Sequence, residues 1–585
     1  MRLPKLTPAV TSRKIVDVFR GYNHNLRIGD GEFFDMRNMT SDHYPVLSPR
    51  GARGVYAKPS APNGMIAKDG LCYVDGTHFV MNEYRVDMGL STAKADSPKQ
   101  LISMGAYVII MPDKKWINTM DLTDFGDIEA SFTSQEDVTF ELCTITGDSY
   151  TDTVVSPTAP DSPENMDLWI DTAATPHTLK RYSSSSDMWV NVATTYVKIS
   201  SPGLGKAFKQ YDGVTISGIK TTGAEGLNGI FGVWGRGDDY IVVTGIIDTV
   251  AIQKADQGAV TVARKMPNMD YIVESENRLW GCRYGDSIDG QIVNEIYACK
   301  LGDFKNWNCF MGLSTDSYAA SCGTDGPFTG AITHLGYPLF FKENCVHKVY
   351  GNYPANFMIQ TTACRGVQKG CERSLAIVNE TLFYKARSGI CAFDGSLPAE
   401  SSYALGGESY SNAVGGAHGN KYYVSMMDIH GDWNLFVFDT AKGMWHREDN
   451  FHAMEFCSCA GELYCIDADA LNIITMLGSA DPGEEKVKWM VQTGELAISS
   501  PDMKYISRLT LRMSMEIGSS AEIFVQYDMS DEWISACNIF STNLRSFSVP
   551  IRPRRCDHMK LRIQGEGGMK IYSITKTIEQ GSDVS

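Results

Sequence analysis

The segment LGYPLFFKEN (Leu335–Asn344) places a short turn in front of a run of aromatic and aliphatic residues. The same order returns three times further along the chain, at VNETLFYKA (Val378–Ala386), HGNKYYVSM (His418–Met426) and AGELYCID (Ala460–Asp467). Counted from Tyr337 to the matching Glu380, Asn420 and Gly461, the steps are 43, 40 and 41 residues. A period of about 40–50 residues with short alternating strands is typical of a β-propeller, in which each repeat forms a four-stranded blade.

Three earlier segments carry the same pattern: KDGLCYVDG (Lys68–Gly76), MGAYVIIM (Met104–Met111) and SENRLWGC (Ser275–Cys282). The 54 glycines, 27 tyrosines and 24 phenylalanines also favour tight turns and aromatic strands. We therefore predict an all-β chain whose main domain is a propeller of about six or seven irregular blades. The one stretch with any helical character is Lys14–Phe19, where we expect at most a single turn.

Two regions depart from the repeat. About 170 residues separate the second and third copies, and they read as a β-rich module inserted into a propeller loop. The last hundred residues contain longer, strictly alternating strands such as ISRLTLRMSM (Ile506–Met515), which predict a β-sandwich or jelly roll. The predicted organisation is an N-terminal arm, a first propeller part, the inserted module, a second propeller part and a C-terminal sandwich (1–60, 61–139, 140–263, 264–480 and 481–585).

The formal net charge is −16, and the chain has no extended block rich in lysine and arginine. The compact basic run RPRR (Arg552–Arg555) lies in a strand-like segment, where we expect it to cap a sheet edge. This balance argues against a protein that grips nucleic acid, because such proteins use basic patches to release counterions. An acidic wall is compatible with a channel through which DNA passes without binding.

The N-terminus has no apolar stretch of signal-peptide length, and no run of 18 apolar residues occurs, so we expect neither export by such a signal nor a membrane-spanning segment. The 15 cysteines are scattered without CxxC pairs and are expected to be reduced, partly buried thiols. No motif predicts a cofactor, a metal site or catalytic residues.

Two segments resemble a known family. RGYNHNLRIGDGEFFDMRNMTSDHYPVLSPRGARGVY (Arg20–Tyr56) resembles the N-terminal arm of bacteriophage tail and neck structural proteins. NMDLWIDTAATPHTLKRYSSSSDMWVNVATTYVKI (Asn165–Ile199) is similar to a short unit that is scattered through phage tail proteins. Together with the order of arm, propeller and C-terminal sandwich, the chain resembles the tail nozzle (stabilisation) proteins of short-tailed phages.

The resemblance implies a structural virion protein, made in the host cytoplasm, which forms a homo-oligomeric ring such as a hexamer. Such a ring would extend the DNA channel, retain the genome, guide DNA ejection and contact portal, adaptor and tail fibre proteins. The genomic DNA would pass through without specific binding. On this reading we expect the chain not to be an enzyme.

Two alternatives remain open at this stage. A carbohydrate- or receptor-binding tail or baseplate protein would present aromatic platforms, for which Trp189, Trp234 and Trp280 are candidates. A propeller glycosidase would place two carboxylates roughly 5–10 Å apart over a cleft. Sequence alone does not rank the acidic candidates for that role, among them Asp239, Glu274, Glu276 and Asp286.

One tryptophan carries a prediction about the scaffold. The segment NLFVFDTAKGMWHRED (Asn434–Asp449) reads as a strand, a polar turn and a tryptophan that opens the next strand. We predict that this segment closes a blade hairpin and that Trp445 packs in the interior.

Overall fold

The computed structural model describes residues 11–92, 99–286, 290–496, 503–528 and 530–580. Within these residues the regular structure consists of strands β1 to β53 and six short 3₁₀ helices, η1 to η6. The prediction of an all-β chain is confirmed. No helix among the described residues is long and apolar enough to cross a membrane.

Seven antiparallel groups of four strands, which we call sheets, make up the middle of the molecule. Five are separate four-stranded sheets, β40 to β43 form one end of a 13-stranded sheet, and the last group joins β44 to β46 with β6 of the arm. Their strands are β7 (Pro62–Ala67), β8 (Leu71–Asp75), β9 (His78–Met81) and β10 (Tyr84–Asp87); β11 (Gln100–Met104), β12 (Tyr107–Met111), β13 (Lys115–Asn118) and β14 (Asp121–Asp127); β28 (Tyr271–Ser275), β29 (Arg278–Asp286), β30 (Ile292–Ala298) and β31 (Tyr318–Ser321); β32 (Gly330–His334), β33 (Tyr337–Lys342), β34 (Cys345–Tyr350) and β35 (Met358–Ala363); β36 (Ala376–Val378), β37 (Thr381–Ala386), β38 (Gly389–Phe393) and β39 (Ala399–Glu400); β40 (Tyr410–His418), β41 (Lys421–Asp428), β42 (Trp433–Asp439) and β43 (Met444–Arg447); and β44 (Ala453–Cys459), β45 (Glu462–Asp467) and β46 (Ile473–Thr475) with β6 (Gly54–Ala57).

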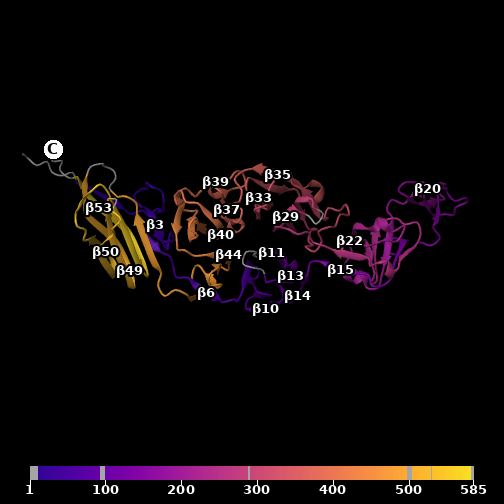
Figure 1. The fold of residues 1–585 in the computed structure, drawn as a ribbon, viewed down its shortest axis with the longest axis horizontal. Coiled ribbons are helices and arrows are strands. Elements are labelled where there is room, and N and C mark those ends of the chain that lie inside the picture. The colour runs from indigo at the N-terminus through magenta and orange to yellow at the C-terminus, as the bar shows by residue number, and fades with distance from the viewer. Residues whose placement is uncertain (1–10, 93–98, 287–289, 497–502, 529, 581–585) are drawn as a thin grey trace, which may run out of the picture.

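These sheets follow one another in a closed circuit, which we call the ring. Neighbouring sheets touch through their first strands: β7 with β11, β11 with β28, β28 with β32, β36 with β40, and β40 with β44. The short helix η5 (Glu372–Ser374), which precedes β36, contacts β32, and β44 returns to contact β7. In Figure 1, β11, β40 and β44 lie towards the middle of the ring, while β10, β14, β35 and β39 lie at its periphery.

Apolar side chains fill the spaces between neighbouring sheets. Ile109 of β12 and Leu279 of β29 belong to one buried cluster, and Leu435 of β42 and Leu463 of β45 belong to another. At the closing point, Val80 of β9 lies in a cluster with Ile466 of β45. Each sheet therefore buries both faces against its neighbours, which accounts for the almost continuous apolar runs in strands such as β33 and β37.

The N-terminal arm is woven into the sheets of its own chain. Strand β6 pairs with β46 and supplies the outer strand of the last sheet. Strand β2 (Gly21–Tyr22) pairs with β43 on one side and with β3 (Glu32–Arg37) on the other. Two short pairs complete this region, with β4 (Met39–Thr40) against β5 (Ser48–Pro49) and β47 (Asp481–Pro482) against β6.

A large inserted part leaves the ring after β14 and returns at β28. Its strands are β15 (Ala130–Thr133), β16 (Val138–Cys143), β17 (Val154–Ser156), β18 (Leu168–Asp171), β19 (Thr178–Ser183), β20 (Met188–Asn191), β21 (Tyr196–Ser200), β22 (Gly213–Ser217), β23 (Gly229–Gly232), β24 (Gly235–Arg236), β25 (Tyr240–Thr244), β26 (Ala251–Gln253) and β27 (Thr261–Arg264). Two sheets, β15-β27-β22-β23 and β24-β25-β21-β16-β26, enclose a shared core that includes Phe140, Val214 and Val243. A small sheet, β17 to β20, lies at the far end of the molecule (Figure 1).

The other 3₁₀ helices lie in loops: η1 (Leu204–Ala207), η2 (Glu225–Leu227), η3 (Ala255–Gln257), η4 (Pro354–Asn356) and η6 (Tyr403–Leu405).

The C-terminal part lies at the opposite end from the inserted part (Figure 1). It contains β1 (Thr11–Val16), β48 (Lys488–Thr493), β49 (Lys504–Tyr527), β50 (Ile534–Val549), β51 (Arg555–Cys556), β52 (Met559–Glu566) and β53 (Met569–Gln580). The long strand β49 pairs first with β53 and then with β52, while β50 runs along its other edge. Alternate side chains of β49, such as Leu509, Leu511 and Met513, are buried, as the alternating sequence pattern indicates.

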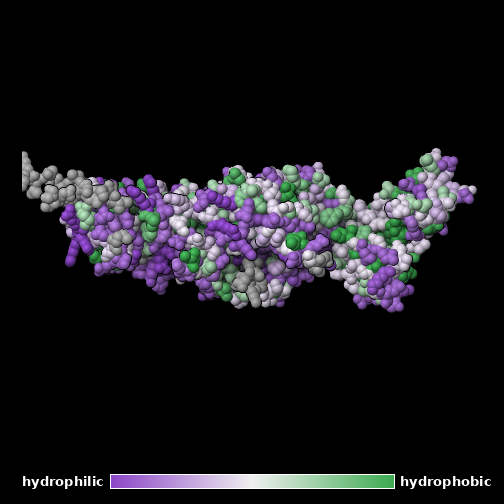
Figure 2. Space-filling model, turned by 45° about the horizontal axis from the view of Figure 1, so that its top comes forward, coloured by the Kyte–Doolittle hydropathy of each residue, from purple (hydrophilic) through white to green (hydrophobic). Residues whose placement is uncertain are grey.

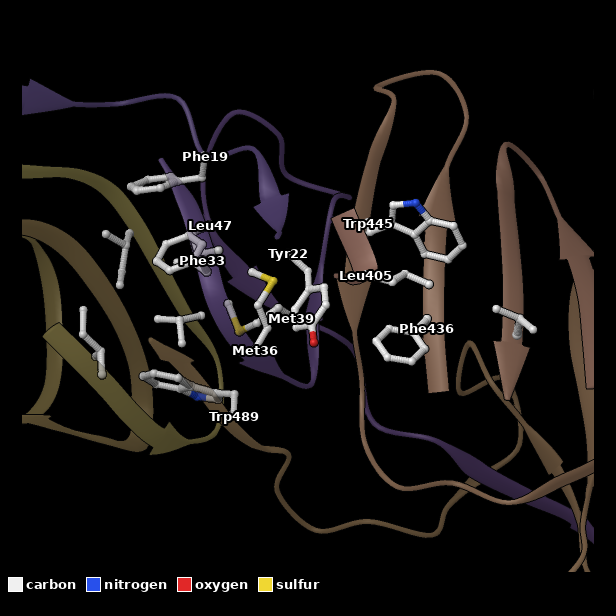
Figure 3. Packing of buried hydrophobic residues seen from close by; sticks show 14 of the residues in the cluster. Phe19, Tyr22, Phe33, Met36, Met39, Leu47, Leu405, Phe436, Trp445 and Trp489 are labelled. Carbon is white, nitrogen blue, oxygen red and sulfur yellow. The ribbon is translucent and has the colours of Figure 1, made fainter. Parts of the chain in front are cut away.

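The arm also joins the C-terminal part to the ring. Strand β3 pairs with β48, so one hydrogen-bonded path runs from β43 through β2, β3 and β48 into the C-terminal strands. Figure 3 shows the buried cluster at this junction, where Tyr22 and Met36 of the arm lie between Trp445 and Trp489. Trp445 is 2% exposed, as predicted for a packed scaffold residue.

The expected helical turn at Lys14–Phe19 is wrong. Lys14 and Ile15 belong to β1, which pairs in antiparallel register with β53. The β-branched pair Ile15 and Val16 favours an extended chain, and the edge of β53 supplies the hydrogen-bond partners that an isolated helical turn would lack.

Candidate functional site

The first strands of the sheets bring polar residues to the centre of the ring. A cavity of about 390 Å³ there is lined by residues of β11, β12, β28 and β32 and of the helix η5. The Gln100 amide at the start of β11 donates to the Asp270 carbonyl at 2.9 Å and accepts from the Ile272 N–H at 3.1 Å. This side chain therefore joins two neighbouring sheets at the wall of the cavity. We call this cavity the axial cavity.

Charged groups of both signs surround the axial cavity. The Asp270 carboxylate accepts a hydrogen bond from the Arg283 guanidinium at 2.7 Å. Arg373 of η5 donates to the Met454 carbonyl at 2.5 Å and lies 4.0 Å from the carboxylate of Glu455 in β44. These contacts tie η5 to β44, so Arg373 reaches from one side of the ring to the strand that closes it.

Glu455 of β44, which contacts Arg373, is a carboxyl group with a strongly raised pKa. Its side chain retains 23% exposure, but it is surrounded by protein, and its Oε2 atom has no hydrogen-bond partner among the described residues. Burial raises the pKa of Glu455 to about 7, and Arg373 opposes the rise only in part. A carboxyl group with a pKa near neutrality is able to give up or take up a proton at physiological pH.

A second carboxylate acts on the same cavity. Burial raises the pKa of the Tyr271 hydroxyl, and the charge of Glu372 raises it further. Tyr271 and Glu372 both line the axial cavity. Two carboxylates, Asp270 and Glu372, and the Arg373 guanidinium thus line the axial cavity, and Arg373 links it to the titrating Glu455 of β44.

The acidic candidates named from the sequence do not come together. Asp239 lies in the inserted part and accepts from the Gly203 N–H at 2.7 Å. Glu274 accepts from the Asn277 N–H in the turn between β28 and β29, and Glu276 lies in that turn with a φ of 51°. Asp286 lies at the opposite end of β29, so these four residues form no carboxylate pair across a cleft.

The three candidate platform tryptophans also lie apart. Trp189 belongs to β20 in the small outer sheet, Trp234 lies between β23 and β24, and Trp280 is buried in β29. Trp189 packs edge-on against Trp169 with ring centroids 5.5 Å apart. No shared sugar platform results from these three rings.

The residues of the axial cavity carry no sequence motif. Glu372 and Arg373 stand just before the short strand β36, and Glu455 interrupts the apolar pattern of β44. The usable signal is a charged residue within or just before the first strand of a repeat, where the strand faces the ring axis. Among the described residues, no group of three or more His, Cys, Asp or Glu side chains is placed to hold a metal ion.

A buried ionic network fixes the arm to the ring. Arg53 donates to Glu448 at 2.7 Å and to Asp449 at 2.9 Å, and Arg50 pairs with Glu484 at 2.8 Å. The two arginine side chains are almost fully buried. The two arginines of the arm therefore bind both the β43–β44 connection and Glu484 through charge-assisted hydrogen bonds, which are stronger than neutral ones.

No protein-family model and no curated protein matches the chain. Solved structures similar to it include an exo-β-1,3-galactanase from Phanerochaete chrysosporium, with a TM-score of 0.22 and 9% identity over 52% of this chain and 94% of that one. An engineered GH43 glycoside hydrolase with endo-xylanase and exo-arabinofuranosidase activity matches with a TM-score of 0.20 and 9% identity over 53% and 96%. Trypanosoma rangeli sialidase matches with a TM-score of 0.19 and 9% identity over 97% and 95%.

These three proteins are hydrolases, which contradicts the expectation that the chain is not an enzyme. That expectation is withdrawn. With TM-scores below 0.5, the likenesses assign no substrate or reaction to this chain, and the chemistry of its own axial cavity is the basis for any such assignment.

Proposed function

We propose that the chain is a structural protein of a bacteriophage tail or neck, of the kind that forms the nozzle of short-tailed phages. In this proposal the ring is a seven-bladed β-propeller, residues 130–264 form its inserted module, and the C-terminal part is a β-sandwich. The motifs at Arg20–Tyr56 and Asn165–Ile199 support this assignment by their resemblance to phage tail proteins.

The observation that carries the proposal is the linear order of the parts. The C-terminal part and the inserted part lie at opposite ends of the ring, so the molecule is elongated (Figure 1). The inserted end has its own buried core, while the core of the C-terminal end continues through the arm into the ring. An elongated subunit of this kind suits a tubular assembly, because copies packed side by side form a wall and each end remains free for a different neighbour.

In the assembly, copies of the chain form an oligomeric ring, such as a hexamer, around the DNA channel. Its ends contact the portal or adaptor and the tail fibres. This oligomeric ring extends the channel, retains the genome and guides DNA ejection. The net charge of −16 supports this role, since an acidic surface repels the phosphate backbone.

Electron microscopy tests the proposal at two levels. Negative staining of the purified full-length chain is expected to show rings of constant subunit number. Antibodies raised against the chain are expected to label the tail or neck of phage particles from the same source. A chain that stays monomeric at every concentration and leaves the particles unlabelled would overturn the proposal.

The axial cavity favours a second candidate, a tail component that binds or cleaves glycans. Glu455 with a pKa of about 7 is suited to general acid catalysis, and it contacts Arg373, which lines the cavity. Glu372 and Asp270 on the cavity wall are carboxylates of the kind that stabilise positive charge on a sugar ring. Incubation with a panel of bacterial surface polysaccharides tests this candidate. Cleavage that is lost in Glu455→Gln and Glu372→Gln, but kept in the exposed turn variant Glu380→Gln, would support it.

A further inference from the structure

A second cavity opens between two neighbouring sheets of the ring, away from the axis. It has a volume of about 370 Å³ and lies between the β28–β29 turn and the β32–β33 turn. Its wall includes Trp280, Phe357 and Val349, and Trp280 and Phe357 pack edge-on with ring centroids 4.9 Å apart. We call this the lateral cavity.

Arg278 brings a buried positive charge to the wall of the lateral cavity. Its side chain is 2% exposed, and it donates to the carbonyls of Cys299, Ser314 and Asp316 at 2.8, 3.1 and 2.6 Å. The guanidinium lies over the Phe357 ring at 5.5 Å. Main-chain carbonyls and one aromatic face thus provide most of its immediate surroundings.

The charge of Arg278 has no ion-pair partner. Among the described residues no carboxylate oxygen lies within 4.0 Å of the Arg278 guanidinium, whose hydrogen bonds go to main-chain carbonyls. Burial lowers the pKa of Arg278, and the charge of the nearby Asp316 carboxylate opposes this only in part. Buried arginines of the arm and of the inserted part differ in this respect, since Arg53 pairs with Glu448 and Arg264 pairs with Asp212. A buried cation that lacks a counter-charge is costly, and a carboxylate entering the cavity would relieve that cost.

The mouth of the lateral cavity carries a leucine in a conformation that leucine disfavours. Leu335 has a φ of 51° and is 53% exposed, and Gly336 completes the two-residue turn. At the matching turn of the other six sheets stand small or polar residues, namely Asp69–Gly70, Gly105–Ala106, Glu276–Asn277, Asn379–Glu380, Gly419–Asn420 and Ala460–Gly461. Asparagine or glycine would adopt this left-handed conformation at lower cost, so an exposed leucine here indicates a use for its side chain.

Aliphatic and aromatic side chains continue the rim. Leu301 and Tyr337 line the cavity and are exposed to solvent. Aliphatic side chains such as those of Leu301 and Leu335 match the apolar side chains of a polypeptide better than the hydroxyl groups of a sugar. Residues that dominate the energy of protein contacts are enriched in tryptophan, tyrosine and arginine and lie in desolvated pockets, and this cavity is lined by Trp280, Tyr337 and Arg278.

We propose that the lateral cavity is a docking site for an acidic segment of another polypeptide chain. An Asp, Glu or C-terminal carboxylate of that segment pairs with Arg278, and a flanking apolar residue packs against Leu335 and Tyr337. The site does not depend on a role in a phage tail. Glu276 also lines the cavity, and its negative charge is expected to repel an acidic ligand and weaken its binding.

Peptide binding to the full-length chain tests the site. The probes are capped pentapeptides with a central Asp or Glu between leucine and phenylalanine, each matched to the same peptide with Asn or Gln. By calorimetric titration we expect the acidic peptides to bind at least about tenfold more tightly than their amide counterparts, which corresponds to about 1.4 kcal/mol. Equal binding of both members of each pair, or binding of neither, would overturn the proposal.

Two variants locate the binding without disturbing Arg278. Leu335→Asn places a residue suited to the turn, so the chain is expected to remain as stable as the wild type while acidic peptides bind about tenfold more weakly. Glu276→Gln removes the opposing charge and is expected to strengthen binding about threefold, whereas Glu380→Gln at the matching turn of another sheet is expected to change nothing. Glucuronate and N-acetylneuraminate serve as competitors: if these sugar acids bind and the peptides do not, the polypeptide assignment is wrong.

Discussion

Trp445 tests the packing between the ring and the arm at the level of one residue. Its ring is almost fully buried, and its centroid lies 4.9 Å from that of the tilted Phe438 ring. Its Nε1 donates to the Ser401 carbonyl at 2.9 Å. Trp445→Ala is therefore expected to lower the free energy of unfolding by about 3–5 kcal/mol. Urea titration followed by far-UV circular dichroism measures this loss. Trp433→Ala, which removes a half-buried ring stacked on His452, is the control and should cost distinctly less.

Glu455 makes a second prediction at the residue scale, about pH. Its pKa is raised from an ordinary 4.5 to about 7 in the folded chain, so the folded state binds the extra proton more tightly than the unfolded state does. The contribution of Glu455 to stability is therefore present below about pH 4.5 and is lost as pH rises to about 7, by up to about 3 kcal/mol. Glu455→Gln removes this dependence.

The measurement is the difference in unfolding free energy between wild type and Glu455→Gln at about pH 5 and about pH 8. Relative to the wild type, the variant is expected to be more stable at the higher pH than at the lower pH. Taking the difference cancels other titrating groups, such as the buried His446, whose pKa is lowered to about 4 by burial. A difference that does not change with pH would contradict the altered pKa of Glu455.

At the scale of elements, the attachment of the arm to the ring depends on the ion pairs of Arg53. Arg53→Met would leave Glu448 and Asp449 without this buried cationic partner, and removal of one partner from a buried ion pair typically costs about 3–5 kcal/mol. Thermal unfolding and limited proteolysis of the arm measure the effect. Arg387→Met breaks a pair with Glu343 in which the arginine side chain is 70% exposed, and it should cost less than about 1 kcal/mol. Equal losses in the two variants would show that the network does not hold the arm.

The elements also show where sequence reasoning succeeds. The seven turn-plus-strand segments quoted from the sequence each fall on the first hairpin of one of the seven sheets, because a tight turn and an apolar strand are local features. The pairing of β6 with β46 joins residues about 420 positions apart, and no local pattern fixes such a register. Lys14 was misassigned for the same reason, since its partner strand β53 lies at the other end of the chain.

The candidate sites were harder to predict than the fold. Glu276 was named from the sequence as a possible catalytic acid, but it lies at the mouth of the lateral cavity and is not paired with a second carboxylate across a cleft. Glu455 and Arg278 were not singled out, because what distinguishes them is burial without a full set of partners. That property arises only when strands from different repeats meet, so a single sequence carries no sign of it.

At the scale of the whole molecule, charge determines the expected behaviour toward DNA. The surface in Figure 2 is largely hydrophilic, with hydrophobic residues in small separate patches, and the chain carries a net charge of −16. Proteins that bind DNA without sequence preference do so with dissociation constants on the order of 10⁻⁴–10⁻⁶ M at physiological salt, and their binding strengthens as salt falls. A channel wall that lets DNA slide is expected to repel DNA, so lowering the salt concentration should not produce binding.

Fluorescence anisotropy of a labelled DNA duplex measures whether the chain binds DNA and how the binding depends on salt. We expect no binding by the full-length chain at about 150 mM salt, and none at about 10 mM, because the lower ionic strength lengthens the range of repulsion to about 30 Å. The exposed arginines of the run Arg552–Arg555 are the main local exception to the acidic balance. A variant with these arginines changed to Gln separates a local contact from the behaviour of the whole surface. Binding that strengthens as salt falls and survives in this variant would mean that the chain grips DNA, and the channel role would then be wrong.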